Sequence, residues 1–554
     1  MNQATLAWAA FKNMLRAAAR DPLWAIVALV TGPIRAIEPV LKGLAFLGII
    51  FVIVGIGGAF LLQAIDLGDS LAASVTHQLL LLVLLLALAF RLITNPLILN
   101  FGDMDGETHG SARFATHQEI AALTRADSGL LIGRDGKTGK LLRYDGPAHL
   151  LTMAPTRTGK GVGTILPNLL SADRSVICID PKGENARIAG RARRAFGPVH
   201  VLDPFEVSGQ PSAAFNPLDL LDPNSLDVAE DASTLADALV FDEPGMAGEA
   251  HWNDEAKALI AGLILHIVAQ EPDSRRSLPT LREYLTLAPA AFATLLKDMQ
   301  GSPAAGGLVA RAANRMLSKN DREAAGVLSS AQRHTHFLDS PRMVKALARS
   351  DFRFGQLKTR NETVFLVLPP DRLSAYSRWL RLLVSQSLID MARTPDKPAV
   401  PVLYLLDEFA ALGNLAPVER AMGLMAGYGV QLWPILQDIH QLRATYGQRA
   451  GTFLSNAAVL QVFGVNDHDS ARLVSDLLGQ GTVVFQTMAR AIDAKETGIS
   501  YSEQHVARPL LTPDEVRNMP SELELLFLAG QRPIVAGKLA YYADAEFRGL
   551  YDAP

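Results

Sequence analysis

A short glycine-containing segment, Ala154-Pro-Thr-Arg-Thr-Gly-Lys-Gly161, has the residue types that bind the phosphates of a nucleotide, and we call it the P-loop. Backbone N–H groups of such a loop surround phosphate oxygens, and the N-terminus of the following helix adds a partial positive charge. Lys160 would reach the outer phosphates. The candidate nucleotide-binding residues are Ala154, Pro155, Thr156, Arg157, Thr158, Gly159, Lys160, Gly161 and Val162.

The P-loop departs from the usual pattern G-x-x-x-x-G-K-S/T at both ends. Ala154 replaces the first glycine, and Gly161 stands where a serine or threonine hydroxyl usually binds Mg²⁺. Because that hydroxyl is missing, Thr158 and Thr164 are candidates to help complete the metal shell. Taken alone, the segment could instead be a glycine-rich turn between a strand and a helix, with an exposed lysine.

Two adjacent acidic residues, Asp407 and Glu408, favour the nucleotide interpretation. They follow the apolar run Val402–Leu406, which is typical of a strand buried on both faces. A carboxylate at the end of such a strand, here Asp407, can hold Mg²⁺ directly or through water. The neighbouring Glu408 can orient and deprotonate the attacking water. We therefore predict an ATP and Mg²⁺ site in which Lys160, Asp407 and Glu408 are catalytic and Asp407 is the metal ligand.

A polar side chain ends the next predicted strand along the chain. The stretch Gly429–Gln437 has a strand pattern, and the Gln437 amide could sense the terminal phosphate and position water. The alternative is a strand-end glutamine that only begins a helix. We include Gln437 as the fourth catalytic candidate.

The elements that must position these residues follow an α/β pattern from about residue 101. Leu150–Ala154 predicts a strand that leads into the P-loop, and Val162–Leu170 predicts the helix that leaves it. This is the context that a phosphate-binding loop requires. Ser175–Asp180 predicts a further strand that buries Cys178, the only cysteine, so no intramolecular disulfide can form.

A helical stretch separates the two groups of candidate residues. Apolar residues recur at helical spacing in Trp252–Ala269, whereas strand patterning resumes only at Thr363–Leu368. We therefore predict an all-α domain at 246–350, inserted between the first part (101–245) and the second part (351–554) of a nucleotide-binding domain.

The N-terminal region predicts a membrane anchor at residues 1–100, with transmembrane helices at about 44–65 and 79–99. Leu44–Ile65 has no charged residue, and a helix of that length crosses a hydrocarbon layer of about 30 Å. The second run contains Arg91, so it spans only if that side chain snorkels or faces protein; a buried core helix is its alternative. A hydrophobic content of 49% and a mean hydropathy of +0.17 agree with a membrane segment.

Charge predicts how the anchor is oriented. The segment between the two apolar runs carries Asp66 and Asp69 but no lysine or arginine, and the positive-inside rule then places both termini and the nucleotide-binding domain in the cytoplasm. The formal net charge of −4 gives no global signal for nucleic acid. The basic residues before the first apolar run are Lys12, Arg16, Arg20, Arg35 and Lys42.

The roles of two sets of basic residues stay open: a set in the helical stretch, and the arginines near Asp407 and Gln437. One lies in the helical stretch and could contact DNA phosphates or an acidic partner, or could form an ordinary solvated surface. Ring ATPases usually also place an arginine of a neighbouring subunit near the terminal phosphate. Arg420 and Arg443 lie nearest to the candidate residues in sequence, and neither is assigned this role. The basic residues of the helical stretch are Arg311, Arg315, Lys319, Arg322 and Arg333.

From about residue 78 to the C-terminus, a series of segments resembles motifs of the TraG-like branch of the type IV secretion coupling ATPases. These segments follow one another in the same order as in that family. The P-loop, continued to Gly163, resembles the loop of that branch, which also has glycine at the position of Gly161. Leu406-Asp-Glu-Phe409 and Ile435-Leu-Gln-Asp438 resemble its second nucleotide motif and its sensor. Further similar segments are His109-Gly-Ser-Ala-Arg-Phe-Ala115, Leu142-Arg-Tyr-Asp-Gly-Pro147, Asp180-Pro-Lys-Gly-Glu184, Phe463-Gly-Val-Asn-Asp467 and Tyr501-Ser-Glu-Gln504.

This resemblance implies a RecA-like P-loop domain with an inserted all-α domain and a two-helix transmembrane anchor. It further implies a homo-oligomer, expected to be a hexamer, in the bacterial inner membrane and in contact with the lipid bilayer. The expected partners are type IV secretion channel components and relaxase-bound single-stranded DNA, effector proteins or both. ATP hydrolysis would drive transfer of that cargo through the channel.

Two other functions fit parts of the sequence. An FtsK-like pump for double-stranded DNA would carry a serine or threonine after Lys160 and a C-terminal winged helix, whereas Leu510–Pro554 has strand patterns and a short acidic end. A docking receptor that binds nucleotide with little turnover is the second alternative, and Gly161 favours it.

Overall fold

The computed structural model describes residues 3–20, 22, 25–26, 40–65, 70–101, 110–240, 250–490 and 499–553. The chain divides into two compact units, Met1–Ser111 with Gln480–Arg508, and Ala112–Gly479 with Pro509–Pro554. Several predicted features lie outside the described residues, namely Arg35, Asp66, Asp69, His109 and the domain boundary at 246.

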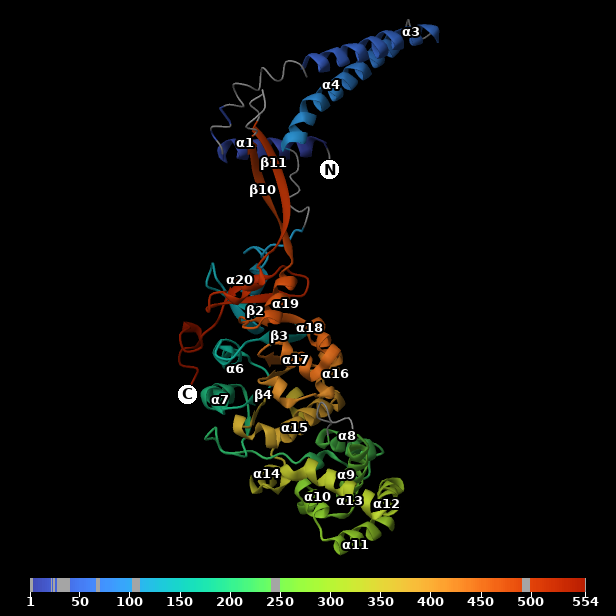
Figure 1. The fold of residues 1–554 in the computed structure, drawn as a ribbon, viewed down its shortest axis with the longest axis vertical. Helices are drawn as coiled ribbons and strands as arrows, with labels where there is room; N and C mark the ends of the chain where they lie inside the picture. Colours follow the sequence, from blue (N-terminus) through green and yellow to red (C-terminus); the bar gives the residue numbers. More distant parts are fainter. Residues whose placement is uncertain are drawn as a thin grey trace. The chain divides into compact units, whose positions relative to one another are not determined.

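An 11-stranded sheet lies at the centre of the larger unit (Figure 1). Its strands are β1 (Leu130–Asp135), β2 (Leu141–Tyr144), β3 (His149–Met153), β4 (Val176–Asp180), β5 (Val199–Leu202), β6 (Thr363–Val367), β7 (Val402–Leu406), β8 (Val430–Leu436), β9 (Ala457–Val462), β12 (Leu523–Leu528) and β13 (Ile534–Gly537). Their spatial order is β2-β1-β13-β12-β9-β3-β8-β7-β4-β6-β5. In this order, neighbouring strands from β9 to β5 pair in parallel. Neighbouring strands from β2 to β9 pair in antiparallel fashion.

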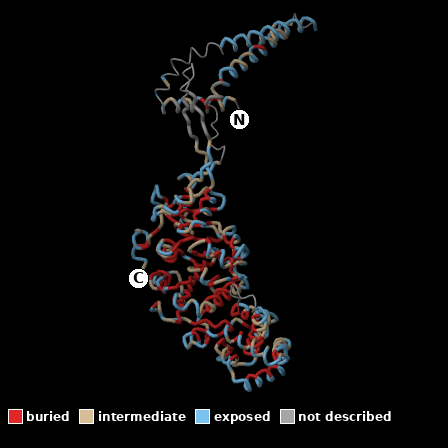
Figure 2. The backbone as a smooth tube through the Cα atoms, viewed as in Figure 1, coloured by how far each residue is buried: buried red, intermediate tan, exposed pale blue. Residues whose placement is uncertain are grey.

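Most of the parallel strands are buried along their whole length, as Figure 2 shows in red at the centre of this unit, and only β5 and β9 begin with partly exposed residues. Strands β3, β4, β6, β7 and β8 have no residue outside the buried class. A strand covered by helices on both faces has no solvent side, so its sequence is a continuous apolar run rather than an alternating one. The run Val402–Leu406 is therefore a strand as predicted, and Cys178 lies fully buried in β4.

Helices cover both faces of this sheet and connect its strands. They are α5 (Ala121–Arg125), η2 (Gly161–Ile165), α6 (Leu166–Ser171), α7 (Glu184–Phe196), α8 (Val228–Leu239), α15 (Leu373–Arg393), α16 (Ala416–Leu424), α17 (Ile439–Tyr446), α18 (Ala450–Asn456), α19 (His468–Leu478) and α20 (Pro513–Arg517). Parallel pairing brings the carboxyl ends of β3, β8 and β7 to one edge, with Met153 opposite Leu436 and Leu406 opposite Pro434. The P-loop, Gln437 and Asp407 follow these ends directly.

A group of helices, α9 to α14, lies at one end of the larger unit, with α9 next to α8 in Figure 1. Its helices are α9 (Ala250–Gln270), α10 (Leu278–Leu285), α11 (Pro289–Gln300), α12 (Ala304–Leu317), α13 (Asp321–Thr335) and α14 (Pro341–Ala346), and residues 250–350 contain no strand. The chain enters and leaves side by side, because Phe215 N donates to Ala346 O (2.9 Å) and Asp351 N donates to Ala214 O (3.0 Å). The division of the chain into domains stays a prediction.

The smaller unit contains α1 (Gln3–Arg20), η1 (Phe51–Ile56), α3 (Gly57–Ala64), α4 (Leu71–Phe101) and the hairpin of β10 (Gln480–Arg490) and β11 (Ile499–Pro509). Two of its helical segments, Val40–Ala64 and Leu71–Asn95, are long and apolar enough to cross a membrane. The second helix begins before residue 79, where the apolar run starts, and polar side chains of its first turns bond to backbone carbonyls. Thr76 Oγ1 donates to Ala72 O (2.7 Å), and His77 Nε2 lies 3.0 Å from Val54 O.

Candidate nucleotide site

The P-loop folds back on itself between β3 and η2. Arg157 (φ 68°) and Gly159 (φ 95°) both adopt the left-handed backbone conformation, which is rare for a residue with a side chain. Thr158 Oγ1 donates to Pro155 O (2.7 Å), and Gly163 N donates to Gly159 O (2.7 Å). These bonds close the loop at the start of the helix, which is the local geometry that favours anion binding.

Lys160 lies between the two acidic side chains that follow β7. Its Nζ is 2.8 Å from Asp407 Oδ1 and 2.5 Å from Glu408 Oε1. Burial opposes the charge of Lys160, but the attraction of Asp407 and the hydrogen bonds to both carboxylates outweigh it and raise the pKa of Lys160 above its usual range. The ammonium group is therefore charged and fully engaged by carboxylates.

Gln437 joins the same cluster from the end of β8. Its Nε2 donates to Glu408 Oε2 (3.1 Å), while Glu408 N donates to Asp407 Oδ1 (2.9 Å). Glu408 has a left-handed backbone (φ 49°), which turns the chain sharply after the strand. Three strand ends thus bring the four predicted catalytic side chains together. Their catalytic roles stay predictions.

The metal-ligand candidates differ in how they are placed. Thr164 is fully buried and donates to Gln461 Oε1 (3.0 Å), so it is wrong as a candidate for Mg²⁺ in this geometry. The Thr158 hydroxyl is used within the P-loop. A Cβ built on Gly161 would meet no heavy atom within 4 Å. Among the described residues no group of three or more His, Cys, Asp and Glu side chains is arranged to hold a metal ion, and Asp407 stays the predicted ligand.

Asp180 ends β4, the strand next to β7, and has a structural contact of its own. It is buried, and its Oδ2 accepts a hydrogen bond from Ala186 N (2.9 Å) in α7. Burial raises the pKa of Asp180 to about 6, and the nearby Asp407 adds to the effect. The acidic motif beginning at Asp180 therefore ties α7 to the nucleotide edge of the sheet.

A buried polar network beneath the P-loop was missed by sequence reasoning. Gln461 Oε1 on β9 accepts from Thr152 Oγ1 (2.8 Å) as well as from Thr164, and Gln461 Nε2 donates to Glu524 Oε2 (2.8 Å) on β12. Trp433 on β8 donates to Thr152 Oγ1 (2.8 Å). The available signal was the presence of isolated polar residues within otherwise apolar strand runs, such as Gln461 in β9 and Glu524 in β12. The network connects four neighbouring strands to the helix that follows the P-loop.

Two of the five basic residues predicted as a cluster in the helical group, Arg315 and Lys319, pair with acids of the same group. Arg315 Nη2 lies 2.6 Å from Glu255 Oε1, and Lys319 Nζ lies 3.0 Å from Glu255 and 2.6 Å from Glu323. This pairing favours the solvated-surface interpretation over a DNA contact. Arg420 and Arg443 are both exposed, on α16 and α17, and stay without an assigned role.

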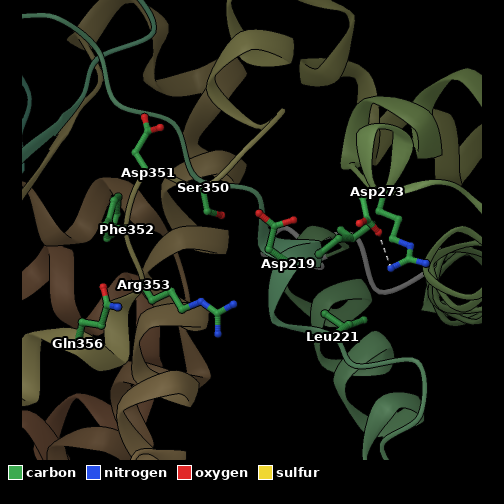
Figure 3. Close-up of a pocket in the computed structure, with 10 residues that line it drawn as sticks. Asp219, Leu221, Asp273, Ser350, Asp351, Phe352, Arg353 and Gln356 are labelled. Atoms are coloured by element: carbon green, nitrogen blue, oxygen red, sulfur yellow. Dashed lines mark ion pairs between the residues drawn. The ribbon is translucent and has the colours of Figure 1, made fainter.

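A separate cleft of about 520 Å³ lies where the helical group meets the α/β part (Figure 3). Asp273 and Arg276 form an ion pair in it (2.8 Å), and Asp219, Asp351 and Arg353 also line it. None of the predicted nucleotide or metal residues lines this cleft. The candidate site is therefore identified by the reactive side chains that meet at the ends of neighbouring strands, and not by the size of a cavity.

Comparisons with known proteins identify the family of this chain. The family model described as type IV secretory system conjugative DNA transfer matches residues 113–551. The conjugal transfer protein TraG of Escherichia coli is 30% identical over 523 residues, which covers 83% of this chain and 81% of TraG.

Solved structures of a conjugative coupling protein share the fold. Unbound TrwBdeltaN70 gives a TM-score of 0.61 at 19% identity, covering 80% of this chain and 95% of that one. TrwB in complex with ADP and Mg²⁺ gives 0.57 at 20% identity, covering 77% and 94%. The predicted fold class is confirmed: a RecA-like P-loop α/β domain with an inserted helical group, in a chain with two candidate transmembrane helices near its N-terminus.

Proposed function

The chain belongs to the type IV secretory system conjugative DNA transfer family, and from that premise we propose that it is a coupling ATPase of a conjugation or type IV secretion system. It would recruit DNA–relaxase or protein substrates and use ATP hydrolysis to drive them through the secretion channel. The observation that carries this proposal is the meeting of Lys160, Asp407, Glu408 and Gln437 at one edge of the sheet.

Lys160 can exchange its carboxylate partners for phosphate oxygens when ATP binds. Its ammonium now contacts two carboxylates, and the phosphates of ATP offer oxygen acceptors of the same kind. When Lys160 moves to the phosphates, Glu408 becomes free to accept a proton from water. The water oxygen then attacks the γ-phosphorus, and the bond between this phosphorus and the β–γ bridging oxygen breaks to leave ADP and phosphate.

Gln437 and the loop backbone supply the positioning. The Gln437 amide already donates to Glu408 and can hold that carboxylate while water is deprotonated. The residues present also fit Mg²⁺, because Asp407 offers a carboxylate at the strand end and the space beside Gly161 is open. Asp407 would hold the ion together with phosphate oxygens, and the ion would neutralise phosphate charge. TrwB, which shares the fold, was solved with ADP and Mg²⁺.

Location and assembly complete the proposal. The two candidate transmembrane helices would anchor the chain in the bacterial inner membrane, with both termini and the ATPase domain in the cytoplasm. The domains would be 1–100, 101–245 with 351–554, and 246–350. The chain would act as a homo-oligomer, expected to be a hexamer, in contact with channel components. Hydrolysis per subunit should then rise with protein concentration, and a rate independent of concentration would contradict assembly dependence.

The test of the ATPase is phosphate release by the full chain in detergent, for wild type and Glu408→Gln. Glu408→Gln should keep nucleotide binding and lose turnover by about 10²–10⁴-fold, because the general base is removed. Glu323→Gln is the matched control, since Glu323 also pairs with a lysine but lies in the helical group; its turnover should equal wild type.

The docking receptor is the second candidate, and the absence of a hydroxyl at Gly161 favours it. Equal, near-zero phosphate release by wild type and Glu408→Gln, with intact nucleotide binding, would support the receptor and overturn the ATPase. An FtsK-like pump has less support. The C-terminal residues form α20, β12 and β13, and both strands join the main sheet instead of forming a separate winged helix.

A further inference from the structure

A second lysine lies behind the P-loop, on the face away from Asp407 and Glu408. Lys538 follows β13, and its Nζ donates to Phe463 O (2.6 Å) and to Thr158 O (3.3 Å). The ammonium also lies 4.9 Å from the centre of the Phe463 ring. No local motif distinguishes Lys538, because its neighbours belong to an ordinary strand end. Strand order alone brings it to the P-loop.

The bond to Thr158 fixes the direction of one P-loop peptide. Thr158 C=O and Gly159 N–H belong to the same planar trans peptide and point in opposite directions. When the carbonyl points to Lys538, the Gly159 N–H points away from Lys538, toward the open side of the loop. Among the residues that the structure describes, no hydrogen-bond acceptor is found for this N–H. It is therefore available to a phosphate oxygen.

This peptide needs an outside anchor because glycine follows it. Gly159 has φ 95°, and a Cβ on it would meet nothing within 4 Å, so neither packing nor a side chain restrains its rotation. A flipped peptide would present a carbonyl oxygen to the phosphates and repel them. The Lys538 ammonium favours the orientation in which the negative end of the peptide dipole faces away from the nucleotide.

The segment that carries Lys538 is itself well positioned. Lys538 N donates to Glu522 O (2.8 Å), and Tyr541 N donates to Val162 O (3.4 Å) in the first turn after the P-loop. A Cβ on Gly163 would lie only 2.9 Å from Leu539 O. The C-terminal segment therefore runs in contact with both the P-loop and its helix. Burial lowers the pKa of Lys538, which marks the cost of keeping an ammonium group there.

We propose that Lys538 is a positioning residue of the nucleotide site, which holds the Thr158–Gly159 peptide so that the Gly159 N–H faces the phosphates. The inference rests on the proposed function, since it assigns a residue to the same site. Lys538 supports the loop from behind, whereas Lys160 contacts the phosphates. The loop is thus held by two lysines, one from each side.

The test is nucleotide binding by the full chain in detergent, with a fluorescent ATP analogue and Mg²⁺. Lys538→Met should raise the Kd and the KM for ATP about tenfold or more and change kcat by less than about threefold. The loop would contact the phosphates equally in the ground state and in the transition state. Loss of these contacts should therefore weaken ATP binding without slowing the chemical step. Lys538→Arg should restore the Kd to within about threefold, because a guanidinium can also donate to two carbonyls.

Lys358→Met is the matched control. Lys358 is buried whereas Lys538 is half-buried, but burial lowers the pKa of both lysines, and Lys358 Nζ also donates to a carbonyl, Thr394 O (2.6 Å), which is not in the P-loop. This variant should lower the thermal unfolding temperature without changing the Kd. If Lys538→Met does not fold, Lys538→Gln replaces it and should also weaken binding, because the charge is lost.

The outcomes separate this inference from the proposed function. One outcome is that the wild type binds nucleotide, Lys160→Ala does not bind it, and Lys538→Met binds it with the wild-type Kd. That outcome would overturn the role of Lys538 and leave the proposed function intact. An equal loss in Lys358→Met and Lys538→Met would also overturn it, because the effect would then be general destabilisation. No nucleotide binding by the wild type would overturn the proposed function and this inference together.

Discussion

Lys160 in the α/β part and Lys319 in the helical group are each held closely by two carboxylates. Lys160 contacts Asp407 and Glu408 at 2.8 and 2.5 Å, and Lys319 contacts Glu255 and Glu323 at 3.0 and 2.6 Å. Their side chains are similarly covered, with 17% and 9% of their surface exposed. Ion pairing and burial therefore do not distinguish a reactive lysine from a structural one.

The backbone around each lysine makes the difference. One partner of Lys319, Glu323, follows it by four residues and the other, Glu255, lies on α9, whereas both partners of Lys160 directly follow β7 and meet the P-loop through the parallel sheet. Beside Lys160, left-handed residues at Arg157 and Gly159 open a loop of backbone N–H groups at a helix start. A phosphate can replace the carboxylates there, while Lys319 has no such loop beside it.

Replacement of each lysine should give the largest difference in phosphate release between the two regions. Lys160→Ala should reduce phosphate release by about 10²–10³-fold, the usual cost of removing one preorganised charge contact. Lys319→Ala should leave phosphate release at the wild-type value, because its partners are structural. Steady-state assays of both variants at saturating ATP provide the measurement, and equal losses would break the comparison.

Acidification should weaken the α/β part through His149 on β3. His149 Nδ1 accepts from Leu432 N (2.9 Å), and its Nε2 lies 3.1 Å from Ala421 O. Burial lowers the pKa of His149 to about 4 from 6.5, so the folded state favours the neutral ring. Its contribution is present above pH 6.5 and is lost as pH falls toward 4, up to about 3 kcal/mol.

Chemical unfolding between pH 7 and 4 measures this effect. His149→Gln should remove that part of the pH dependence. His336→Gln, at an exposed histidine of the helical group, should leave it unchanged. A wild-type unfolding free energy that stays constant over this range would contradict the assignment to His149.

Loss of Gln437 should have a smaller effect than loss of Lys160. Gln437→Ala removes the amide that donates to Glu408, so the general base is less well oriented and kcat should fall about 10–100-fold. The nucleotide Kd should change little. Gln332→Ala is the control in the helical group, where Gln332 donates to Leu285 O. An unchanged kcat in Gln437→Ala would remove Gln437 from the catalytic set.

The smallest effect is expected for the stability of the helical group. Lys319→Ala should cost about 1 kcal/mol or less in unfolding free energy, since ion pairs near the surface contribute little. The cost should shrink further at 1 M salt, where charges are screened. Urea unfolding at low and high salt would show this, and a salt-independent loss above 2 kcal/mol would point to a packing role.

The strand ends were predictable because buried parallel strands are continuous apolar runs. Val402–Leu406 is β7 residue for residue, and Asp407, Glu408 and Gln437 could be placed at one edge from parallel pairing alone. Contacts that depend on the order of strands in space were not predictable. Lys538 and Gln461 reach the P-loop only because β13, β12 and β9 lie next to one another and β9 beside β3.

Other expectations failed for local reasons. Thr164 looked like a replacement metal ligand, but the helix turns its hydroxyl into the core toward Gln461. The helix that contains the second apolar run begins at Leu71, before the run itself, and the transmembrane bounds stay a prediction. The grouping of Gln480–Arg508 with the N-terminal unit also has no sequence signal.

The open space beside Gly161 has a consequence for how this family can diverge. A side chain at Gly161 would meet no heavy atom within 4 Å, whereas one at Gly163 would meet Leu539 O at 2.9 Å. A serine or threonine side chain can therefore be accommodated at position 161 without repacking. Packing leaves phosphate and metal chemistry as the constraint on Gly161, whereas any side chain at Gly163 would also disturb the close approach of the C-terminal segment.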